Sequence, residues 1–204
     1  LDAYQTQSRN RVRQQVAAIY ESLRTEGIVY CEPPTNFEKY GQRLRLADKV
    51  LTEKLGTCID TTLLMASCLE QAGICPILVL LQGHALVGAW LTPSVYGQMV
   101  CDDPSFLLKE MADGNHDVVL VETTCLTSST PVSFESAVES AAKRMHNEQA
   151  FRYFIDVHRC RLGNIRPLPQ RVEHNGVWSF EQPDTPDTTA TQQINTLSHY
   201  DLRL

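Results

Sequence analysis

The segment from Cys58 to Gln71 constrains the fold of this chain more than any other part of the sequence. At helical spacing its apolar side chains cover most of the circumference, and they are Ile59, Leu63, Leu64, Met65, Ala66, Cys68 and Leu69. Gly73 follows as a helix stop. A helix that is apolar on nearly every side has to be surrounded by other elements, so we expect it at the centre of the fold.

Short apolar runs after this helix predict strands. Residues 76–81 are rich in Ile, Leu and Val, and the run is too short for a helix of its own. Gln82-Gly83 is a turn signal, and residues 84–91 form a second apolar run, so the two runs predict an antiparallel pair. Residues 117–123 predict a third strand, and residues 151–158 predict a further one.

Amphipathic helices are predicted on either side of this unit. Residues 9–26 carry one apolar stripe, with a cap at Ser8 or Asn10 and a stop at Gly27. Residues 134–147 carry another stripe after the capping residue Ser133. The shorter predictions are a strand at 43–46, helices at 47–54 and 106–111, and an end of regular structure at 166–169. The expected fold class is α+β, with a central Cys-bearing helix packed on an antiparallel sheet and flanked by helices.

Length and composition fit one domain followed by a tail. The chain has 204 residues, of which 43% are hydrophobic, and this is enough for one well-buried core. From residue 181 onward Thr, Gln, Asp and Pro dominate, and little can be buried there. We therefore expect a domain over 1–180 and a disordered tail or linker over 181–204. Because the chain starts at Leu1, we also expect it to be part of a longer protein.

Charge and cysteine usage exclude several classes of protein. The formal net charge of −6 argues against general binding of nucleic acids or anionic membranes. The sequence has no apolar run of about 18 residues, so no transmembrane helix is expected. Its seven cysteines have no regular spacing and form no CxxC pair. They predict neither a disulfide framework nor a zinc site, and we expect reduced thiols in a cytoplasmic protein without a metal.

Three residues on three different elements form a candidate catalytic set. Cys58 begins the central helix, His84 begins an apolar strand, and Glu122 lies in the strand predicted at 117–123. A helix N-terminus and a nearby imidazolium both favour a thiolate, which is the nucleophilic form of cysteine. His84 would take the thiol proton and later return it, and Glu122 would orient the imidazole. This order of residue types predicts a cysteine hydrolase or acyltransferase.

Two hydrogen-bond donors are expected to stabilise the oxyanion of such a reaction. The first is the backbone N–H of Cys58, because first-turn amides have no partner within a helix. Gln42 is the candidate for the second, although its amide could equally satisfy loop backbone. Asp102 and Asp103 are rivals for the role of the acid.

Each member of the set also has a purely structural interpretation. A cysteine at a helix start is often an inert core residue, and a histidine that begins a strand is often structural. Glu122, between Val121 and Thr123, can be an edge charge or a cap. The remaining histidines are interpreted as surface residues, and they are His116, His146, His158, His174 and His199.

The motifs around these residues resemble the transglutaminase-like superfamily of papain-fold cysteine enzymes. The motifs are Gly56-Thr57-Cys58-Ile59-Asp60, Gly83-His84-Ala85 and Val121-Glu122-Thr123-Thr124. The resemblance implies that the Cys starts the central helix and that the His and the acid lie on adjacent strands. The usual acid of that family is Asp, so Glu122 is a departure that keeps the carboxylate but alters its reach.

Over roughly residues 10 to 170 the chain looks like one bacterial branch of that superfamily. The similar segments are Ala18-Ile19-Tyr20, Tyr30 with Pro33-Pro34, Gly41-Gln42-Arg43, Leu69-Glu70-Gln71-Ala72-Gly73 and Ile165-Arg166-Pro167-Leu168-Pro169. They resemble the transglutaminase-like module of large bacterial helicase–nuclease proteins of the DUF4011/DUF3320 type. This resemblance implies that the partners are other domains of the same polypeptide, namely a helicase and a nuclease.

Three functions follow from these observations. The preferred one is a thiol-dependent hydrolase, a cysteine peptidase or isopeptidase acting on a protein or peptide substrate through Cys58, His84 and Glu122. The second is a transglutaminase-type acyl transferase, in which an amine replaces water as the acceptor. The third is a non-catalytic module that binds a peptide or positions a neighbouring domain. The chemistry of the first two functions requires no cofactor.

Overall fold

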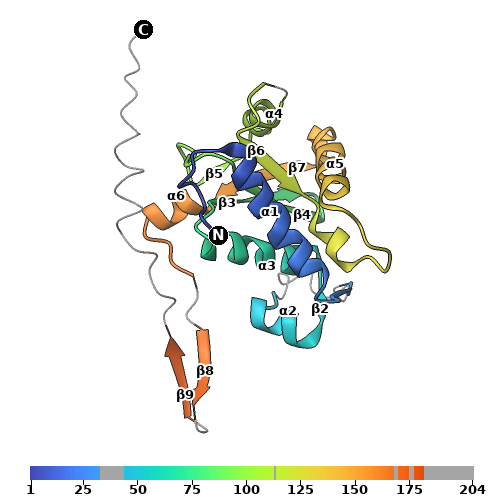
Figure 1. The fold of residues 1–204 in the computed structure, drawn as a ribbon, viewed down its shortest axis with the longest axis vertical. Coiled ribbons are helices and arrows are strands. Elements are labelled where there is room, and N and C mark those ends of the chain that lie inside the picture. The colour runs from blue at the N-terminus through green and yellow to red at the C-terminus, as the bar shows by residue number, and fades with distance from the viewer. Residues whose placement is uncertain (33–43, 113, 168–169, 175–176, 182–204) are drawn as a thin grey trace.

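The computed structural model of the chain describes residues 1–32, 44–112, 114–167, 170–174 and 177–181. Its centre is a five-stranded antiparallel sheet with the strand order β5-β7-β3-β4-β6. Helices α1 and α3 lie along one face of the sheet, and α5 packs along the edge strand β6 (Figure 1). The observed class is therefore α+β, as the sequence predicts.

The sheet grows outward from the predicted antiparallel pair. Leu81 lies opposite His84 across the tight turn, and this register fixes where the second strand begins. The strands are β3 (Pro76–Leu81), β4 (His84–Trp90), β5 (Val100–Cys101), β6 (Val118–Val121) and β7 (Phe151–Asp156). The short strands β1 (Val29–Tyr30) and β2 (Leu55–Gly56) form a separate parallel pair.

The central helix α3 has the bounds that the sequence predicts, Cys58–Gln71. Thr57 caps its start, and Gly73 follows its end with a positive φ of 76°, which a residue with a side chain adopts only with strain. The helix packs on β4 and β3. Eight of its residues are buried, which confirms its expected central position.

The other helices surround this unit. Ser8 caps α1 and Ser133 caps α5, as predicted. The α-helices are α1 (Arg9–Arg24), α2 (Ala47–Glu53), α4 (Ser105–Met111), α5 (Phe134–Met145) and α6 (Val157–Leu162). The 3-10 helices among the described residues are η2 (Thr123–Thr127) and η3 (Glu148–Ala150).

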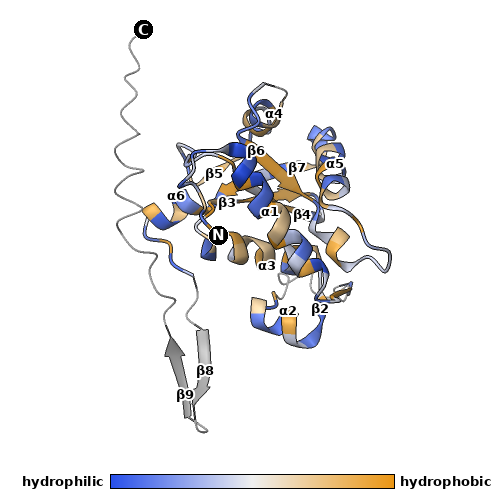
Figure 2. Cartoon of the chain, in the orientation of Figure 1, coloured by the Kyte–Doolittle hydropathy of each residue, from blue (hydrophilic) through white to orange (hydrophobic). Residues whose placement is uncertain are grey.

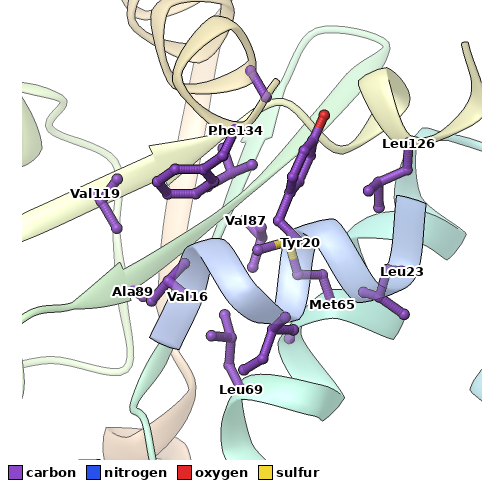
Figure 3. Close-up of a cluster of buried hydrophobic side chains, with 14 of the residues drawn as sticks. Val16, Tyr20, Leu23, Met65, Leu69, Val87, Ala89, Val119, Leu126 and Phe134 are labelled. Carbon is purple, nitrogen blue, oxygen red and sulfur yellow. The ribbon is translucent and has the colours of Figure 1, made fainter. Parts of the chain in front are cut away.

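The sheet buries apolar side chains on both of its faces. On β4, Val87 and Ala89 face the cluster beneath α1 and α3, while Leu86 and Trp90 face the opposite cluster. Figure 2 shows the apolar colour concentrated on the strands of the sheet. In the first cluster Tyr20 lies against α3, β4 and α5 (Figure 3). Both faces of the sheet are thus packed, and the ends of its strands β4 and β6 carry His84 and Glu122.

Several sequence predictions are wrong in detail. Residues 44–46 of the strand predicted at 43–46 form no strand, and residue 43 lies outside the described residues. The third strand is shorter than predicted, so Glu122 directly follows β6 instead of lying within it. The strand predicted at 151–158 ends at Asp156, because this side chain caps α6 by accepting a hydrogen bond from the Arg159 N–H over 2.8 Å.

Regular structure continues beyond the predicted end at 166–169. Strands β8 (Gln170–His174) and β9 (Val177–Glu181) form an antiparallel hairpin. Residues 182–204 of the predicted tail lie outside the described residues, so the domain boundary at 180/181 stays a prediction. Within the described ranges, no helix has the length and apolarity needed to cross a lipid bilayer.

Candidate active site

Cys58 is held at the start of α3 by a reciprocal capping box. The Thr57 Oγ1 accepts a hydrogen bond from the Asp60 N–H over 3.3 Å, and the Asp60 Oδ2 accepts one from the Thr57 N–H over 3.0 Å. Asp60 is fully buried, and its Oδ1 also accepts a hydrogen bond from the Arg45 N–H over 2.8 Å. These contacts fix the first turn, so the Cys58 thiol lies at the positive end of the helix.

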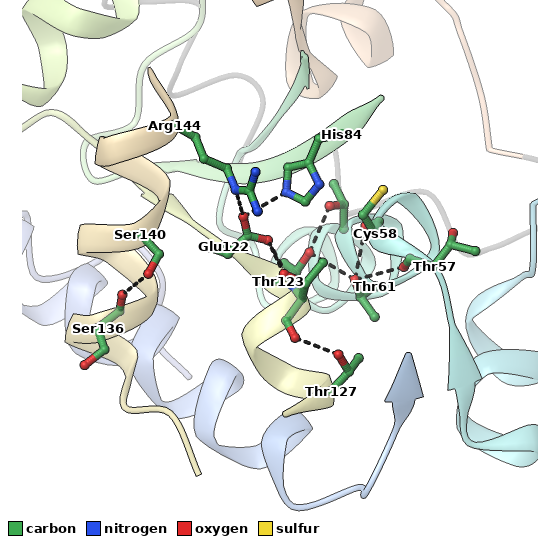
Figure 4. Close-up of polar contacts among 12 residues, drawn as sticks. Thr57, Cys58, Thr61, His84, Glu122, Thr123, Thr127, Ser136, Ser140 and Arg144 are labelled. Atoms are coloured by element: carbon green, nitrogen blue, oxygen red, sulfur yellow. Dashed lines mark hydrogen bonds and ion pairs between the residues drawn. The ribbon is translucent and has the colours of Figure 1, made fainter. Parts of the chain in front are cut away.

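The turn before β4 places His84. Gly83 has a φ of 69°, so the chain reverses tightly and His84 becomes the first residue of the strand. Strand β4 packs on α3, and the imidazole therefore lies beside the helix start that carries Cys58 (Figure 4). The His84 side chain is only 13% exposed.

Glu122 is fixed at the end of β6 by hydrogen bonds to both carboxylate oxygens. Its Oε1 accepts hydrogen bonds from the Thr124 N–H over 3.1 Å and the Thr124 hydroxyl over 2.7 Å. Its Oε2 lies 2.8 Å from the His84 Nε2. Figure 4 shows the His84 ring beside this carboxylate, and the Glu122 side chain is only 3% exposed to water.

A buried threonine cluster links this carboxylate to the nucleophile's helix. The Thr123 Oγ1 accepts a hydrogen bond from the Thr61 hydroxyl over 3.0 Å and lies 3.0 Å from the Thr62 hydroxyl. Thr123 directly follows Glu122, and Thr61 is one helical turn after Cys58. The cluster therefore fixes the turn that carries the acid against the helix that carries the thiol.

Arg144 is a site residue that the sequence analysis missed. It extends from the last turn of α5, and its Nε donates a hydrogen bond to the Glu122 Oε2 in an ion pair. The same oxygen contacts His84. The only signal in the sequence is a basic residue next to the buried Met145, and this pattern is common at helix ends.

The contacts shift the proton affinities of His84 and Glu122 in opposite directions. Burial lowers the pKa of His84, but the hydrogen bonds with Cys58 and Glu122 outweigh burial and raise this pKa to about 9. Burial likewise raises the pKa of Glu122, but the hydrogen bonds from His84 and Thr124 outweigh it and lower this pKa to about 2. An imidazole that binds its proton this firmly can take a proton from a neighbouring thiol.

Tyr30 is a second residue that the sequence analysis did not assign to the site. Its strand runs parallel to β2, with Tyr30 opposite Gly56 and the Cys31 N–H donating to the Gly56 carbonyl over 3.0 Å. Gly56 lies two residues before Cys58. Burial and the Cys58 thiol raise the pKa of Tyr30, so its phenol remains a protonated donor beside the sulfur.

The remaining predicted site residues lie elsewhere. Gln42 lies outside the described residues, so its role stays a prediction. Asp102 and Asp103 follow β5, which is the sheet edge opposite β6, and Asp103 accepts hydrogen bonds from the Ser105 N–H over 2.9 Å and the Ser105 hydroxyl over 2.8 Å. Strands β7 and β3 therefore lie between the strand that precedes these rival acids and the strand that begins with His84.

The other cysteines and histidines differ from Cys58 and His84 in their surroundings. All seven cysteines are free thiols, and burial raises the pKa of Cys75 to about 12. His158, interpreted from sequence as a surface residue, has a buried Nε2 without a hydrogen-bond partner among the described residues. Burial lowers its pKa, so it favours the neutral form. In the described part of the chain, no three His, Cys, Asp or Glu side chains converge as metal ligands do.

The geometry thus brings Cys58, His84 and Glu122 together at one end of α3. Comparison of the chain with protein-family models, with curated proteins and with solved structures found no match. The candidate site therefore stands on its own residues and contacts.

Proposed function

We propose that the chain is a thiol-dependent acyl-transfer hydrolase, a cysteine peptidase or isopeptidase with a Cys58-His84-Glu122 triad. The observation that carries the proposal is the 2.8 Å contact between the His84 Nε2 and the buried Glu122 Oε2, beside a cysteine at a capped helix start. A carboxylate that orients the base of a thiol nucleophile is the arrangement that nucleophilic catalysis requires.

The reaction starts from a thiolate–imidazolium pair, in which the proton of the Cys58 Sγ has passed to the ring nitrogen of His84 that does not contact Glu122. The thiolate attacks the carbonyl carbon of an amide, and the oxygen becomes an oxyanion that the Cys58 N–H stabilises. The imidazolium returns its proton to the leaving amine as the C–N bond breaks, which leaves a thioester on Cys58. Water then attacks the thioester, His84 takes a proton from this water, and the acid product leaves as the thiol re-forms.

The fold is consistent with the papain-like, transglutaminase-like architecture proposed here. A Cys-bearing central helix packs on an antiparallel sheet, His84 begins strand β4, and Glu122 directly follows the neighbouring strand β6. The same proposal includes a cytoplasmic module of a larger bacterial helicase–nuclease protein, whose partners are the other domains and whose substrate is a protein or peptide. Fold alone does not assign a substrate, so the site chemistry has to be tested directly.

The test is to trap the thioester. Wild type is incubated with p-nitrophenyl acetate, and the acetylated residue is mapped by mass spectrometry. We expect acetylation at Cys58, and release of nitrophenol at a rate that falls at least about tenfold in both His84→Gln and Cys58→Ala. Cys31→Ser is the matched control, because it removes a neighbouring thiol that has no role in the proposed reaction.

The acceptor of the acyl group is identified in a second step. Casein and a mixed peptide library are incubated with wild type and Cys58→Ala, with and without a fluorescent primary amine. New chain ends indicate hydrolysis, and incorporation of the amine into glutamine indicates transglutaminase-type transfer. Acetylation spread over all the cysteines, unaffected by His84→Gln, would overturn the proposed function and favour a non-catalytic module.

A further inference from the structure

Arg144 occupies a position that the three proposed catalytic residues do not require. Glu122 already accepts two hydrogen bonds from Thr124 on Oε1, so its carboxylate is oriented without any help from α5. Arg144 nevertheless donates to Oε2, which is the oxygen that contacts His84. Two cationic donors therefore share one carboxylate oxygen, in a site where the carboxylate is 3% exposed.

We propose that Arg144 is a positioning residue that acts through Glu122, sharing its Oε2 with His84 and so limiting how strongly this carboxylate retains the imidazolium proton. The inference rests on the proposed function for its catalytic meaning, but its physical content concerns only His84, Glu122 and Arg144. An oxygen that accepts from two cations binds each of them less strongly than it would bind one alone.

The charges around His84 give this effect a definite sign. The ring faces the Cys58 thiol from α3, the Glu122 carboxylate from the end of β6 and the Arg144 guanidinium from α5. Its cross-strand neighbour on β3 is the apolar Leu81. Glu122 raises the pKa of His84 and Arg144 lowers it, so the guanidinium is the cation that opposes the imidazolium.

The catalytic consequence concerns the leaving group. A general acid works best when its pKa lies near the working pH. If the Glu122 carboxylate contacted His84 without Arg144, the imidazolium would bind its proton more tightly and would donate it less readily to the leaving group. An amide needs that proton because its leaving amine is a poor leaving group. A nitrophenyl ester does not need the proton, because nitrophenolate leaves without it. Arg144 therefore supports amide cleavage more than ester cleavage.

The test is an NMR titration of the His84 ring in wild type, Arg144→Gln, Arg144→Lys and Glu122→Gln. We expect Arg144→Gln to raise the pKa of His84 by about half a unit to one unit, since the guanidinium is 47% exposed and partly screened by water. Arg144→Lys is expected to restore most of the wild-type value. Glu122→Gln is expected to shift the pKa of His84 downward.

Lys143→Gln provides the matched control. Lys143 lies in the same last turn of α5, and its substitution removes one positive charge without touching the Glu122 contact. We expect this variant to titrate like wild type. A shift in Lys143→Gln equal to that in Arg144→Gln would mean that only net charge matters. An unchanged or lowered pKa of His84 in Arg144→Gln, with thermal unfolding like that of wild type, would also overturn the inference.

Activity gives a second readout that separates this inference from the proposed function. If Cys58 forms a thioester, Arg144→Gln is expected to slow peptide hydrolysis about three- to tenfold at pH 7 and to leave the release of nitrophenol nearly unchanged. Equal losses with both substrates would contradict the inference while leaving the proposed function intact. If no thioester forms in wild type, the proposed function fails, and the His84 titration still decides whether Arg144 acts on this ring.

Discussion

Replacement of Glu122 by Gln is the perturbation whose effect on stability the structure defines most sharply. The substitution keeps the shape of the side chain and removes the charge that His84 and Arg144 share. One amide group then replaces a carboxylate that accepts hydrogen bonds on both oxygens, so at least one of its donors loses its acceptor. Because the position is buried, water does not compensate the loss.

The pKa values give the magnitude and the pH range. The pKa of Glu122 is lowered from 4.5 to about 2 in the folded state. At about 1.4 kcal/mol per pKa unit, this shift corresponds to about 3 kcal/mol of unfolding free energy. Since this folded-state pKa is lowered, the contribution is fully present above pH 4.5 and is lost as the pH falls through about 2. The pKa of His84 is raised from 6.5 to about 9. Its contribution to stability is therefore present below pH 6.5 and is lost as the pH rises through about 9.

These two shifts describe one ion pair from its two ends and are not added. Both groups contribute fully only between pH 4.5 and pH 6.5. We therefore expect Glu122→Gln to lower the free energy of unfolding by about 3 kcal/mol at pH 5.5, and by less near pH 3 and near pH 9.5. At the high-pH end Arg144 and Thr124 still contact the wild-type carboxylate, so part of the loss remains.

The assay is urea unfolding at these three pH values, followed by circular dichroism and tryptophan fluorescence. Glu135→Gln is the control, because the Glu135 side chain is 63% exposed in its ion pair with Arg13 and is expected to contribute less than about 1 kcal/mol. A loss below about 1 kcal/mol for Glu122→Gln at pH 5.5, or an equal loss at all three pH values, would refute the buried ion pair.

Three further substitutions test how the site is assembled. Thr57→Ala removes the cap of α3 and is expected to lower stability by about 1 kcal/mol, measured by urea unfolding, and to slow Cys58 alkylation. Gly83→Ala forces a side chain into a φ of 69° and is expected to cost about 1 kcal/mol, with His84 displaced in NMR spectra. Tyr30→Phe removes a donor beside the thiol and is expected to slow Cys58 alkylation at pH 6.5 about tenfold without changing the circular dichroism spectrum. Unchanged stability in the first two variants, or unchanged alkylation in the third, would show that these contacts do not shape the site.

Hydrophobic periodicity was sufficient to predict the centre of the fold. The bounds of α3 and of β3, Cys58–Gln71 and Pro76–Leu81, agree with the sequence because glycine, proline and strong apolar patterns mark both ends. Strand β5, only Val100–Cys101, was missed because two residues carry no measurable alternation. Helix α6 was missed because its first residues, Val157 and His158, continue the strand pattern of β7.

Only the site residues that have a recognisable signal in the neighbouring sequence could be predicted. Cys58 and His84 each begin an element, and such positions can be recognised from capping and turn residues. Arg144 and Tyr30 reach the site through packing between elements distant in sequence, α5 on β6 and β1 beside β2. No local pattern in a single sequence encodes such a contact, because it depends on how the sheet edge is covered.

The pH dependence of Cys58 alkylation by iodoacetamide, in wild type and His84→Gln, tests the thiolate–imidazolium pair most directly. Modified sites are mapped by mass spectrometry, with the other six cysteines as internal references. We expect Cys58 in wild type to react fastest of the seven cysteines, at rates within about threefold between pH 6 and pH 7.5. In His84→Gln its rate should rise about 30-fold over this range, as expected for an ordinary thiol that stays mostly protonated. A rise of about 30-fold already in wild type, unchanged by His84→Gln, would contradict a thiolate–imidazolium pair at this site.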